Sequence, residues 1–222
     1  MSDDRPQLIA QQRFLEHQQE LAKLDLPTRF EYIFKNNLWG SEESRSGPGS
    51  TMIETRTLRQ EIVTLLHDID ATSMLDIPCG DFHWLNQVDL GVSYIGADIV
   101  PAIAESNQQK YAAPNRRFLC LDATASPLPQ VDLIFCRDCL VHLSYANVHK
   151  ALDNFRASGS RYLLMTHFTG LAENHDIADG DWRALNFTLA PFNLPAPLRL
   201  IVENCIEGDG AFKDKSLGLW KL

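Results

Sequence analysis

The sequence lacks any run of about 18 apolar residues, which is the length that a membrane-spanning helix needs. Its first residues, MSDDRPQLIAQQRF, carry early acids where a signal peptide has a basic start and an apolar middle. It also lacks a basic run that could follow a phosphate backbone, and 20 Lys and Arg against 29 Asp and Glu give a net charge of −9. We therefore expect a cytoplasmic protein that binds neither a membrane nor nucleic acid.

Cysteine is scarce and scattered, at Cys79, Cys120, Cys136, Cys139 and Cys205. An odd number at irregular spacing does not fit a secreted disulfide framework, so we expect reduced thiols. Cys136 and Cys139 form a C-x-x-C pair, but no second pair has the spacing of a zinc site. We interpret the pair as structural and expect no metal site.

The 222 residues fit one α/β domain with a terminal extension. After Ala71, seven short apolar runs predict strands, and the segments 101–111 and 145–157 between them predict helices. Alternating strands and helices form parallel sheets. The last two strands are joined by ENCIEGDGAFKDK, which has no helical stripe, so they should be antiparallel. We expect a Rossmann-like, doubly wound, seven-stranded sheet, mostly parallel with an antiparallel last strand.

The N-terminal part predicts a helical extension followed by a loop. Residues 5–26 carry a loose apolar stripe that ends before Pro27, indicating an accessory helix that packs on the domain or on a second subunit of a homodimer, or else a frayed tail. The glycine-rich segment 39–50 is a loop, and Thr51 with Glu54 fits a capping box that starts the next helix. We divide the chain into residues 1–50, the helix and ligand loop, and residues 51–222, the Rossmann-like domain. The loop is either a lid or shoulder of a binding site, or a solvated connector.

Polar side chains follow four successive predicted strands. The first strand ends in LDIPCGDFHW, the second in Asp98, the third in Asp122, and the fourth in Arg137 and Asp138. Ligands of such sheets bind outside the carboxyl ends of the strands. Asp98 follows Asp76 by 22 residues, the spacing at which an acid can accept hydrogen bonds from a ribose diol. Taken singly, Asp98 and Asp122 could instead cap a helix and a turn.

These motifs resemble the class I S-adenosylmethionine-dependent methyltransferases over roughly residues 70 to 222. Leu75, Asp76 and Gly80 match the first motif of that family, while Pro78 and Phe82 stand where its outer glycines usually are. The segment LDIPCGDFHW, together with the upstream WGSEESRSGPGST, is similar to a bacterial subgroup of the family. The resemblance is specific for the cofactor, S-adenosylmethionine, and indicates almost nothing about the methyl acceptor.

The resemblance implies a cofactor site at the strand ends. Asp98 would hold the ribose hydroxyls, and Asp122 with Ala123 would contact the adenine. The Pro78–Gly80 backbone would line the methionine portion, and Gly80 would let the backbone approach the ligand. Cys136 and Arg137 would close the site. The full candidate set is Trp39, Thr51, Asp76, Pro78, Cys79, Gly80, Asp98, Ile99, Asp122, Ala123, Cys136 and Arg137.

The implied reaction is a direct displacement at the methyl carbon, in which orientation is the largest contribution of the protein. His142 is the first candidate base and His167 the second, although a histidine beside apolar neighbours is more often packed than catalytic. The segment 181–195 contains Ala190-Pro191-Phe192, which superficially resembles a motif of amino-directed DNA methyltransferases. We reject that interpretation because the segment follows the fifth strand and the chain is acidic. We expect the segment to be a substrate-side wall, with Trp182, Phe187 and Phe192, or a packing loop.

The acceptor is expected to be a hydroxyl, carboxyl or amine of a small molecule or glycan. An NAD-type oxidoreductase shares the predicted fold, but the missing glycine fingerprint counts against it. A non-catalytic, methyltransferase-like binding protein is the third possibility, because cofactor residues can persist without turnover.

Overall fold

Residues 5–222, which the computed structural model describes, contain one seven-stranded sheet in the order β3-β2-β1-β4-β5-β7-β6. The strands are β1 (Ser73–Asp76), β2 (Ser93–Asp98), β3 (Arg116–Cys120), β4 (Leu133–Cys136), β5 (Tyr162–Phe168), β6 (Arg199–Val202) and β7 (Lys215–Lys221). Every neighbouring pair from β3 to β5 is parallel, and β7 runs antiparallel to both β5 and β6. The predicted seven strands, the mostly parallel sheet and the antiparallel last strand are confirmed.

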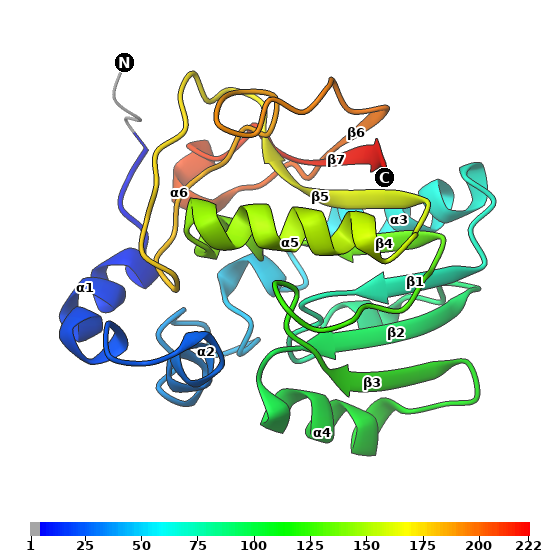
Figure 1. Ribbon diagram of the computed structural model, residues 1–222, viewed down its shortest axis with the longest axis horizontal. Coiled ribbons are helices and arrows are strands. Elements are labelled where there is room, and N and C mark those ends of the chain that lie inside the picture. The colour runs from blue at the N-terminus through cyan, green and yellow to red at the C-terminus, as the bar shows by residue number, and fades with distance from the viewer. Residues whose placement is uncertain (1–4) are drawn as a thin grey trace.

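Helices cover both faces of the sheet, because successive strand residues alternate between the faces. On one face Leu75 packs in a core that includes Val148 and Phe155 of α5 (Tyr145–Ala157), and α5 crosses in front of the sheet in Figure 1. On the other face Met74 packs with residues of α3 (Arg56–Asp68) such as Leu65. A helix α4 (Pro101–Tyr111) joins β2 to β3. The predicted helices 101–111 and 145–157 are therefore confirmed.

The N-terminal extension forms two helices, α1 (Ile9–Leu21) and α2 (Leu26–Lys35). Phe14 and Leu21 of α1 are buried against Ile33 of α2 and Leu38, so the frayed-tail interpretation is wrong. We predicted no helix after Pro27, which lies in the first turn of α2, where its missing N–H needs no partner. The Asp25 carboxylate caps this helix by accepting a hydrogen bond from the Thr28 backbone N–H at 3.0 Å.

The predicted capping box at Thr51 does not start a helix, because α3 begins at Arg56. The Thr51 hydroxyl accepts a long bond of 3.5 Å from the Glu54 backbone N–H. The Glu54 carboxylate, however, accepts from the Ile206 N–H at 3.3 Å instead of reaching back to residue 51. Contact with a distant segment has replaced the local pairing. The glycine-rich loop before it, predicted correctly, contains a single 3-10 turn, η1 (Pro48–Ser50).

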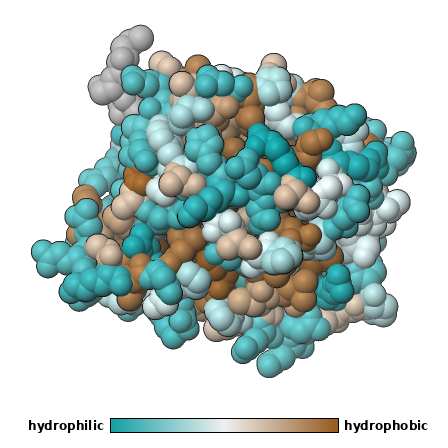
Figure 2. All heavy atoms as spheres, in the orientation of Figure 1, coloured by the Kyte–Doolittle hydropathy of each residue, from teal (hydrophilic) through white to brown (hydrophobic). Residues whose placement is uncertain are grey.

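The remaining elements are short. They are η2 (Leu85–Gln87), η3 (Leu140–His142) and α6 (Glu207–Gly210). No helix within residues 5–222 is long and apolar enough to cross a bilayer. Figure 2 shows hydrophilic side chains over most of one face, with apolar side chains gathered below its centre.

Candidate active site

A deep pocket lies where the carboxyl ends of the parallel strands meet the N-terminal helices, and the arrowheads of β1, β2 and β3 point toward α1 and α2 in Figure 1. It measures about 1020 Å³ including its open mouth. Leu26 and Phe30 of α2 form part of its wall, so the extension completes the pocket. The predicted site residues that line it are Trp39, Asp76, Pro78, Cys79, Gly80, Asp98, Ile99, Asp122, Ala123, Arg137 and His142.

Asp98 is held firmly at the end of β2 and is only 4% exposed. One carboxylate oxygen accepts from the Gly80 N–H at 3.2 Å, and the other accepts from the Val100 N–H at 2.9 Å. Burial raises the pKa of Asp98 to about 6, against these backbone hydrogen bonds, which lower it. Each oxygen of a carboxylate can accept more than one hydrogen bond, so both remain able to accept from a diol.

Asp76 lies beside it at the end of β1 and accepts a 2.6 Å hydrogen bond from the Tyr94 hydroxyl. Burial raises the pKa of Asp76 to about 8. No described residue forms an ion pair with Asp76 or Asp98. The pocket therefore presents buried carboxylates to a ligand that carries hydroxyl groups and positive charge.

Asp122, after β3, can cap a turn and can also accept a hydrogen bond from a ligand. One carboxylate oxygen accepts from the backbone N–H and the hydroxyl of Thr124, both at 2.7 Å, which caps the local turn. The other carboxylate oxygen accepts no hydrogen bond from a described residue, and Asp122 and Ala123 both line the pocket. A capping acid can thus still accept from an exocyclic amine.

A structural requirement for glycine at position 80 stands beside the predicted one, the approach of the backbone to the ligand. Its φ of +54° is in the left-handed region, and a Cβ built there would lie 2.1 Å from the Ser46 hydroxyl oxygen. The side chain that excludes a Cβ therefore belongs to the glycine-rich loop. Phe82, which stands where the family has a glycine, also has a positive φ of 56°, and its ring packs against Tyr94 and Phe118.

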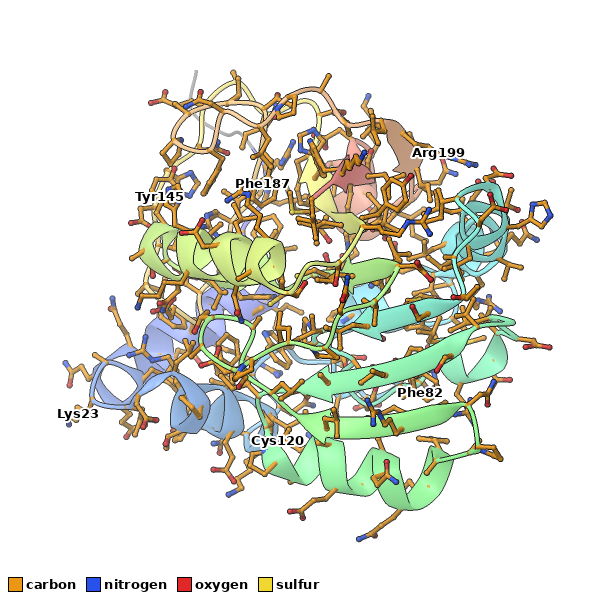
Figure 3. All side chains as sticks on the ribbon, turned by 45° about the vertical axis from the view of Figure 1, so that its right-hand side comes forward. Lys23, Phe82, Cys120, Tyr145, Phe187 and Arg199 are labelled. Atoms are coloured by element: carbon orange, nitrogen blue, oxygen red, sulfur yellow. The ribbon has the colours of Figure 1, made fainter. Side chains whose placement is uncertain are left out.

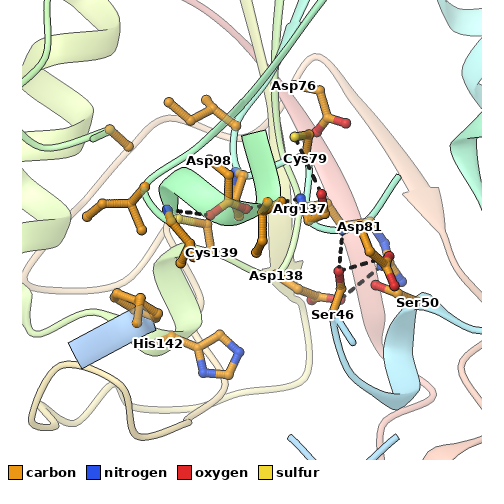
Figure 4. Close-up of a pocket in the computed structure, with 18 of the residues that line it drawn as sticks. Ser46, Ser50, Asp76, Cys79, Asp81, Asp98, Arg137, Asp138, Cys139 and His142 are labelled. Carbon is orange, nitrogen blue, oxygen red and sulfur yellow. Dashed lines mark hydrogen bonds and ion pairs between the residues drawn. The ribbon is translucent and has the colours of Figure 1, made fainter. Parts of the chain in front are cut away.

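The glycine-rich loop is docked onto the first strand's loop through Asp81, which we did not single out. The Asp81 carboxylate accepts from the Ser44 hydroxyl at 3.0 Å, the Arg45 N–H at 2.8 Å and the Ser46 hydroxyl at 3.1 Å. The Asp81 N–H in turn donates to the Ser46 hydroxyl oxygen at 2.9 Å. Figure 4 shows Ser46, Ser50 and Asp81 on one side of the pocket. The two sequence segments that carry the subgroup resemblance thus form one structural unit.

His142 faces the pocket and packs against Trp39 in a tilted arrangement, with 5.6 Å between the ring centroids. Its Nδ1 lies 2.8 Å from the Asp181 carbonyl oxygen, so Nδ1 carries the proton and Nε2 has the lone pair. Burial lowers the pKa of His142 to about 4, which keeps the ring neutral at pH 7. Figure 4 shows its imidazole below Cys139 and Asp138.

Three predicted site residues do not line this pocket. His167 is packed against Phe187 and Trp220, and its Nδ1 accepts from the Phe187 N–H at 3.2 Å. Cys136 is 1% exposed and belongs to the core beneath α5. Side chains alternate between the faces of the sheet, and that of Cys136 points to the face that α5 covers. Thr51 lies behind η1, outside the wall.

The expected substrate-side wall of residues 181–195 is mostly a packing loop. Phe187 and Phe192 belong to the hydrophobic core that packs against α5. In the view of Figure 3, Phe187 lies above α5, away from Cys120 at the end of β3. Trp182 differs because it lines a second, smaller cavity.

A buried charge network, unpredicted from the sequence, closes the far end of the pocket. Arg137 donates to the Glu203 carboxylate at 2.6 Å and contacts Asp138 at 3.1 Å. Lys215 contacts the same Asp138 carboxylate at 2.7 Å. Glu203 is 2% exposed, so its charge is stable there only because of these cations. Its partners are Arg137, which directly follows β4, and Lys215, the first residue of β7, and these are distant in sequence but close in the sheet. Within residues 5–222 no group of three or more His, Cys, Asp or Glu side chains could hold a metal ion.

The hydrogen-bond acceptors of the pocket fit S-adenosylmethionine. Asp98 would offer two oxygens to the ribose diol, Asp122 would offer one to the adenine amine, and Asp76 would place a buried carboxyl group near the positively charged methionine portion. Phe82 occupies a place where a dinucleotide site needs glycine to approach a pyrophosphate.

Comparison with known proteins agrees with a site for S-adenosylmethionine. A family model for a methyltransferase domain matches residues 74–158. The fold is similar to the N-methyltransferase NodS from Bradyrhizobium japonicum WM9 in complex with S-adenosyl-L-homocysteine, with 14% identity, a TM-score of 0.63, and 89% of this chain and 98% of that chain covered. It is also similar to the methyltransferase domain of bacterial CtHen1-C, with 12% identity, a TM-score of 0.57, and 78% and 99% covered. No protein of curated function matches the chain in sequence.

The likeness to the solved structures establishes the fold, which is that of the class I methyltransferases. The matched family model, which covers the strand-end motifs, favours methyl transfer over the oxidoreductase alternative. Residues 74–158 thus match a methyltransferase domain, within a chain that has the fold of the class I methyltransferases.

Proposed function

We propose that the protein is an S-adenosylmethionine-dependent methyltransferase and that it transfers the methyl group of this cofactor to a nucleophile on a small-molecule or glycan acceptor. The observation that carries this proposal is a second cavity beside the cofactor pocket, which shares Trp39, Ser46, Asp138 and His142 with it. Its enclosed volume is only about 60 Å³, which suits a small group rather than a polymer surface. Free cysteines and the acidic charge support a cytoplasmic site of action and disfavour nucleic acid.

Bound S-adenosylmethionine supplies an electrophilic methyl group on a sulfonium. Asp98 holds the ribose, and the packed walls of both cavities orient the nucleophile, an effect that can lower a barrier by about 7 to 11 kcal/mol at best. His142 places the lone pair of Nε2 at the shared wall, where it can accept a hydrogen bond or a proton from the nucleophile. Because its pKa is about 4, His142 is a weak base that positions more than it deprotonates.

A thermal-shift panel tests the cofactor part. S-adenosylmethionine and S-adenosylhomocysteine at 100 times their dissociation constants should each add about 2.7 kcal/mol of stability, and NAD and NADP should add none. Stabilisation by NAD alone would contradict the assignment. Turnover is tested separately, by release of S-adenosylhomocysteine with a panel of acceptors.

The two histidines make a matched pair for the acceptor part. We expect His142→Asn to lower kcat while the affinity for S-adenosylhomocysteine stays within twofold, because its role is at the shared wall. His167→Asn should leave kcat nearly unchanged in the folded fraction, since His167 lines neither cavity. A larger loss of kcat in His167→Asn would reverse these roles.

A further inference from the structure

The second cavity has a composition that selects the chemistry of its ligand. The loop from Ser46 to Gly49 forms one part of its lining, and Asp138, Glu207 and Lys215 are the charged residues of that lining. The side walls are apolar and aromatic, formed by Leu8, Ala10, Trp39, Phe168, Trp182 and Phe212. We propose that this cavity binds the methyl acceptor and that the acceptor is an amine, whose ammonium group pairs with the Glu207 carboxylate. The proposal rests on the proposed function and specifies its substrate class.

Glu207 is the surplus acid of the cavity. Lys215 is already engaged, with its ammonium 2.7 Å from Asp138 and 3.8 Å from Glu203. Arg137 is engaged with Glu203 and Asp138, at 2.6 and 3.1 Å. Among residues 5–222, no cation lies within ion-pair distance of Glu207. The three charged residues in the lining therefore sum to −1, and the cavity favours a ligand of charge +1.

The surroundings of Glu207 favour a cationic ligand more than a neutral one. Burial raises the pKa of Glu207, and nearby Asp138 and Glu54 raise it further, while Lys215 and Arg137 lower it. A neutral hydroxyl ligand would leave that partly desolvated carboxylate without a compensating charge. An anionic ligand would meet two carboxylates, and it would have to compete with Asp138 for Lys215.

The aromatic walls suit the carbon skeleton of such a ligand. Cations are attracted to the faces of aromatic rings, and this cluster already holds one, because the Arg5 guanidinium lies 5.0 Å from the centroid of Phe168 and 5.8 Å from that of Phe212. Arg5 is paired with Asp214 at 2.7 Å, so its charge does not compensate Glu207. Trp39 and Trp182 also line the cavity.

Trp39 adds a second polar requirement. Its indole nitrogen is buried and has no hydrogen-bond acceptor among the described residues, although Trp39 lines both cavities. Buried indole N–H groups normally have a partner. An acceptor molecule that carries an oxygen as well as an amine would supply one.

The chemical step balances with these groups. The bound ammonium gives one proton to the Glu207 carboxylate and becomes a neutral amine. The nitrogen lone pair then forms the new N–C bond as the C–S bond breaks, and the bonding electrons remain on sulfur. The product is a methylated ammonium ion and S-adenosylhomocysteine, and the proton on Glu207 leaves to solvent.

Paired amines and alcohols test the proposal. The probes are 2-phenylethylamine, cyclohexylamine and glucosamine, each against its hydroxyl counterpart, 2-phenylethanol, cyclohexanol and glucose. Binding is measured by calorimetry to the protein saturated with S-adenosylhomocysteine, and turnover by release of that product from S-adenosylmethionine. The variants are Glu207→Gln and, as a matched surface control, Glu173→Gln, which is exposed and lines neither cavity.

We expect at least one amine to bind and react at least tenfold better than its alcohol. Glu207→Gln should remove that preference, with S-adenosylhomocysteine affinity unchanged, and Glu173→Gln should behave as wild type. If Glu207→Gln does not fold, Gly49→Ala serves instead, because its Cβ would lie 3.2 Å from the Asp138 carboxylate and 3.3 Å from the Lys215 ammonium and so narrow the cavity.

Three results overturn the amine assignment. They are a preference for alcohols, an amine preference that survives Glu207→Gln, and no binding of any amine to the protein saturated with S-adenosylhomocysteine. Loss of S-adenosylhomocysteine binding in the wild-type protein would instead defeat the proposed function, so the two failures are distinguishable.

Discussion

The two cavities handle buried charge in opposite ways. In the cofactor pocket, Asp76 and Asp98 are buried without an ion-pair partner among the described residues, and burial raises the pKa of each. Where that pocket meets the second cavity, Arg137 and Lys215 compensate Asp138 and Glu203 through direct contacts. The first arrangement needs a ligand that carries hydroxyl groups and positive charge, whereas the second is largely satisfied by the protein itself. The difference indicates that the first site is specific for its cofactor and that Glu207 leaves one charge for an acceptor.

The largest effect is expected where the charge balance of the second cavity is broken. Glu203→Ala leaves Arg137 without its closest partner, and removing one member of a buried pair costs about 3 to 5 kcal/mol. Chemical denaturation should show this loss of unfolding free energy. The control is Asp153→Ala, which breaks the exposed pair with Arg156 and should cost less than about 1 kcal/mol. Equal losses in the two variants would mean that the network is not a stabilising one.

The uncompensated acids of the cofactor pocket predict a pH dependence. The pKa of Asp76 is raised to about 8 in the folded protein, so between its unfolded value and pH 8 the folded state binds a proton that the unfolded state has lost. Stability should therefore fall as pH rises through this range. His142 and His167, whose pKa values are lowered to about 4, act in the opposite direction, but only below about pH 6.5.

The window from pH 6.5 to 8 isolates Asp76. We expect the unfolding free energy to fall there by at most about 1.4 kcal/mol per pH unit. Asp76→Asn keeps the shape of the side chain without its titration and should flatten the slope. The same slope in the variant and the wild type, measured by denaturation at each pH, would show that Asp76 is not the titrating group.

A smaller effect is expected at the joint between the glycine-rich loop and Asp81. We predict that the loop, residues 39–51, closes over the bound cofactor or acceptor, so S-adenosylhomocysteine should slow amide hydrogen exchange there. Asp81→Ala removes the acceptor for the Arg45 N–H and two serine hydroxyls. At about 0.5 to 1.5 kcal/mol per net hydrogen bond, the loss of even one of these bonds should make exchange in the ligand-free loop roughly two- to tenfold faster, and the loss of all three should have a larger effect. Unchanged exchange in both comparisons would make the loop a passive connector.

The cofactor pocket could be predicted because one continuous segment builds most of it. Asp76 and Asp98 end their strands and Asp122 follows its strand, and parallel strands bring their carboxyl ends to one edge whatever the details of packing. The turn-capping role of Asp122 was also readable, since short-range hydrogen bonds depend on nearby residues, whereas Asp98 is not the N-cap of α4, which is Val100.

The second cavity could not be predicted in the same way. Gly49, Asp138, Glu207 and Lys215 are far apart in the sequence, and only the pairing of β7 with β5 and the docking of the loop bring them together. The short α6 that carries Glu207 has residues in the left-handed backbone conformation at Gly208 and Asp209, and no periodic pattern of apolar residues predicts this element. The helix α2 was predictable in principle, because Asp25 before Pro27 is a helix-start signal.

The account depends most on Asp98 as the residue that binds the cofactor's ribose. Calorimetry with S-adenosylhomocysteine on wild type, Asp98→Ala and the exposed control Asp89→Ala tests this directly. Losing hydrogen bonds to a charged acceptor should cost about 1.5 to 3 kcal/mol, so Asp98→Ala should bind roughly 10- to 100-fold more weakly while Asp89→Ala matches wild type. A folded Asp98→Ala variant with wild-type affinity would contradict the assignment of this pocket to S-adenosylmethionine.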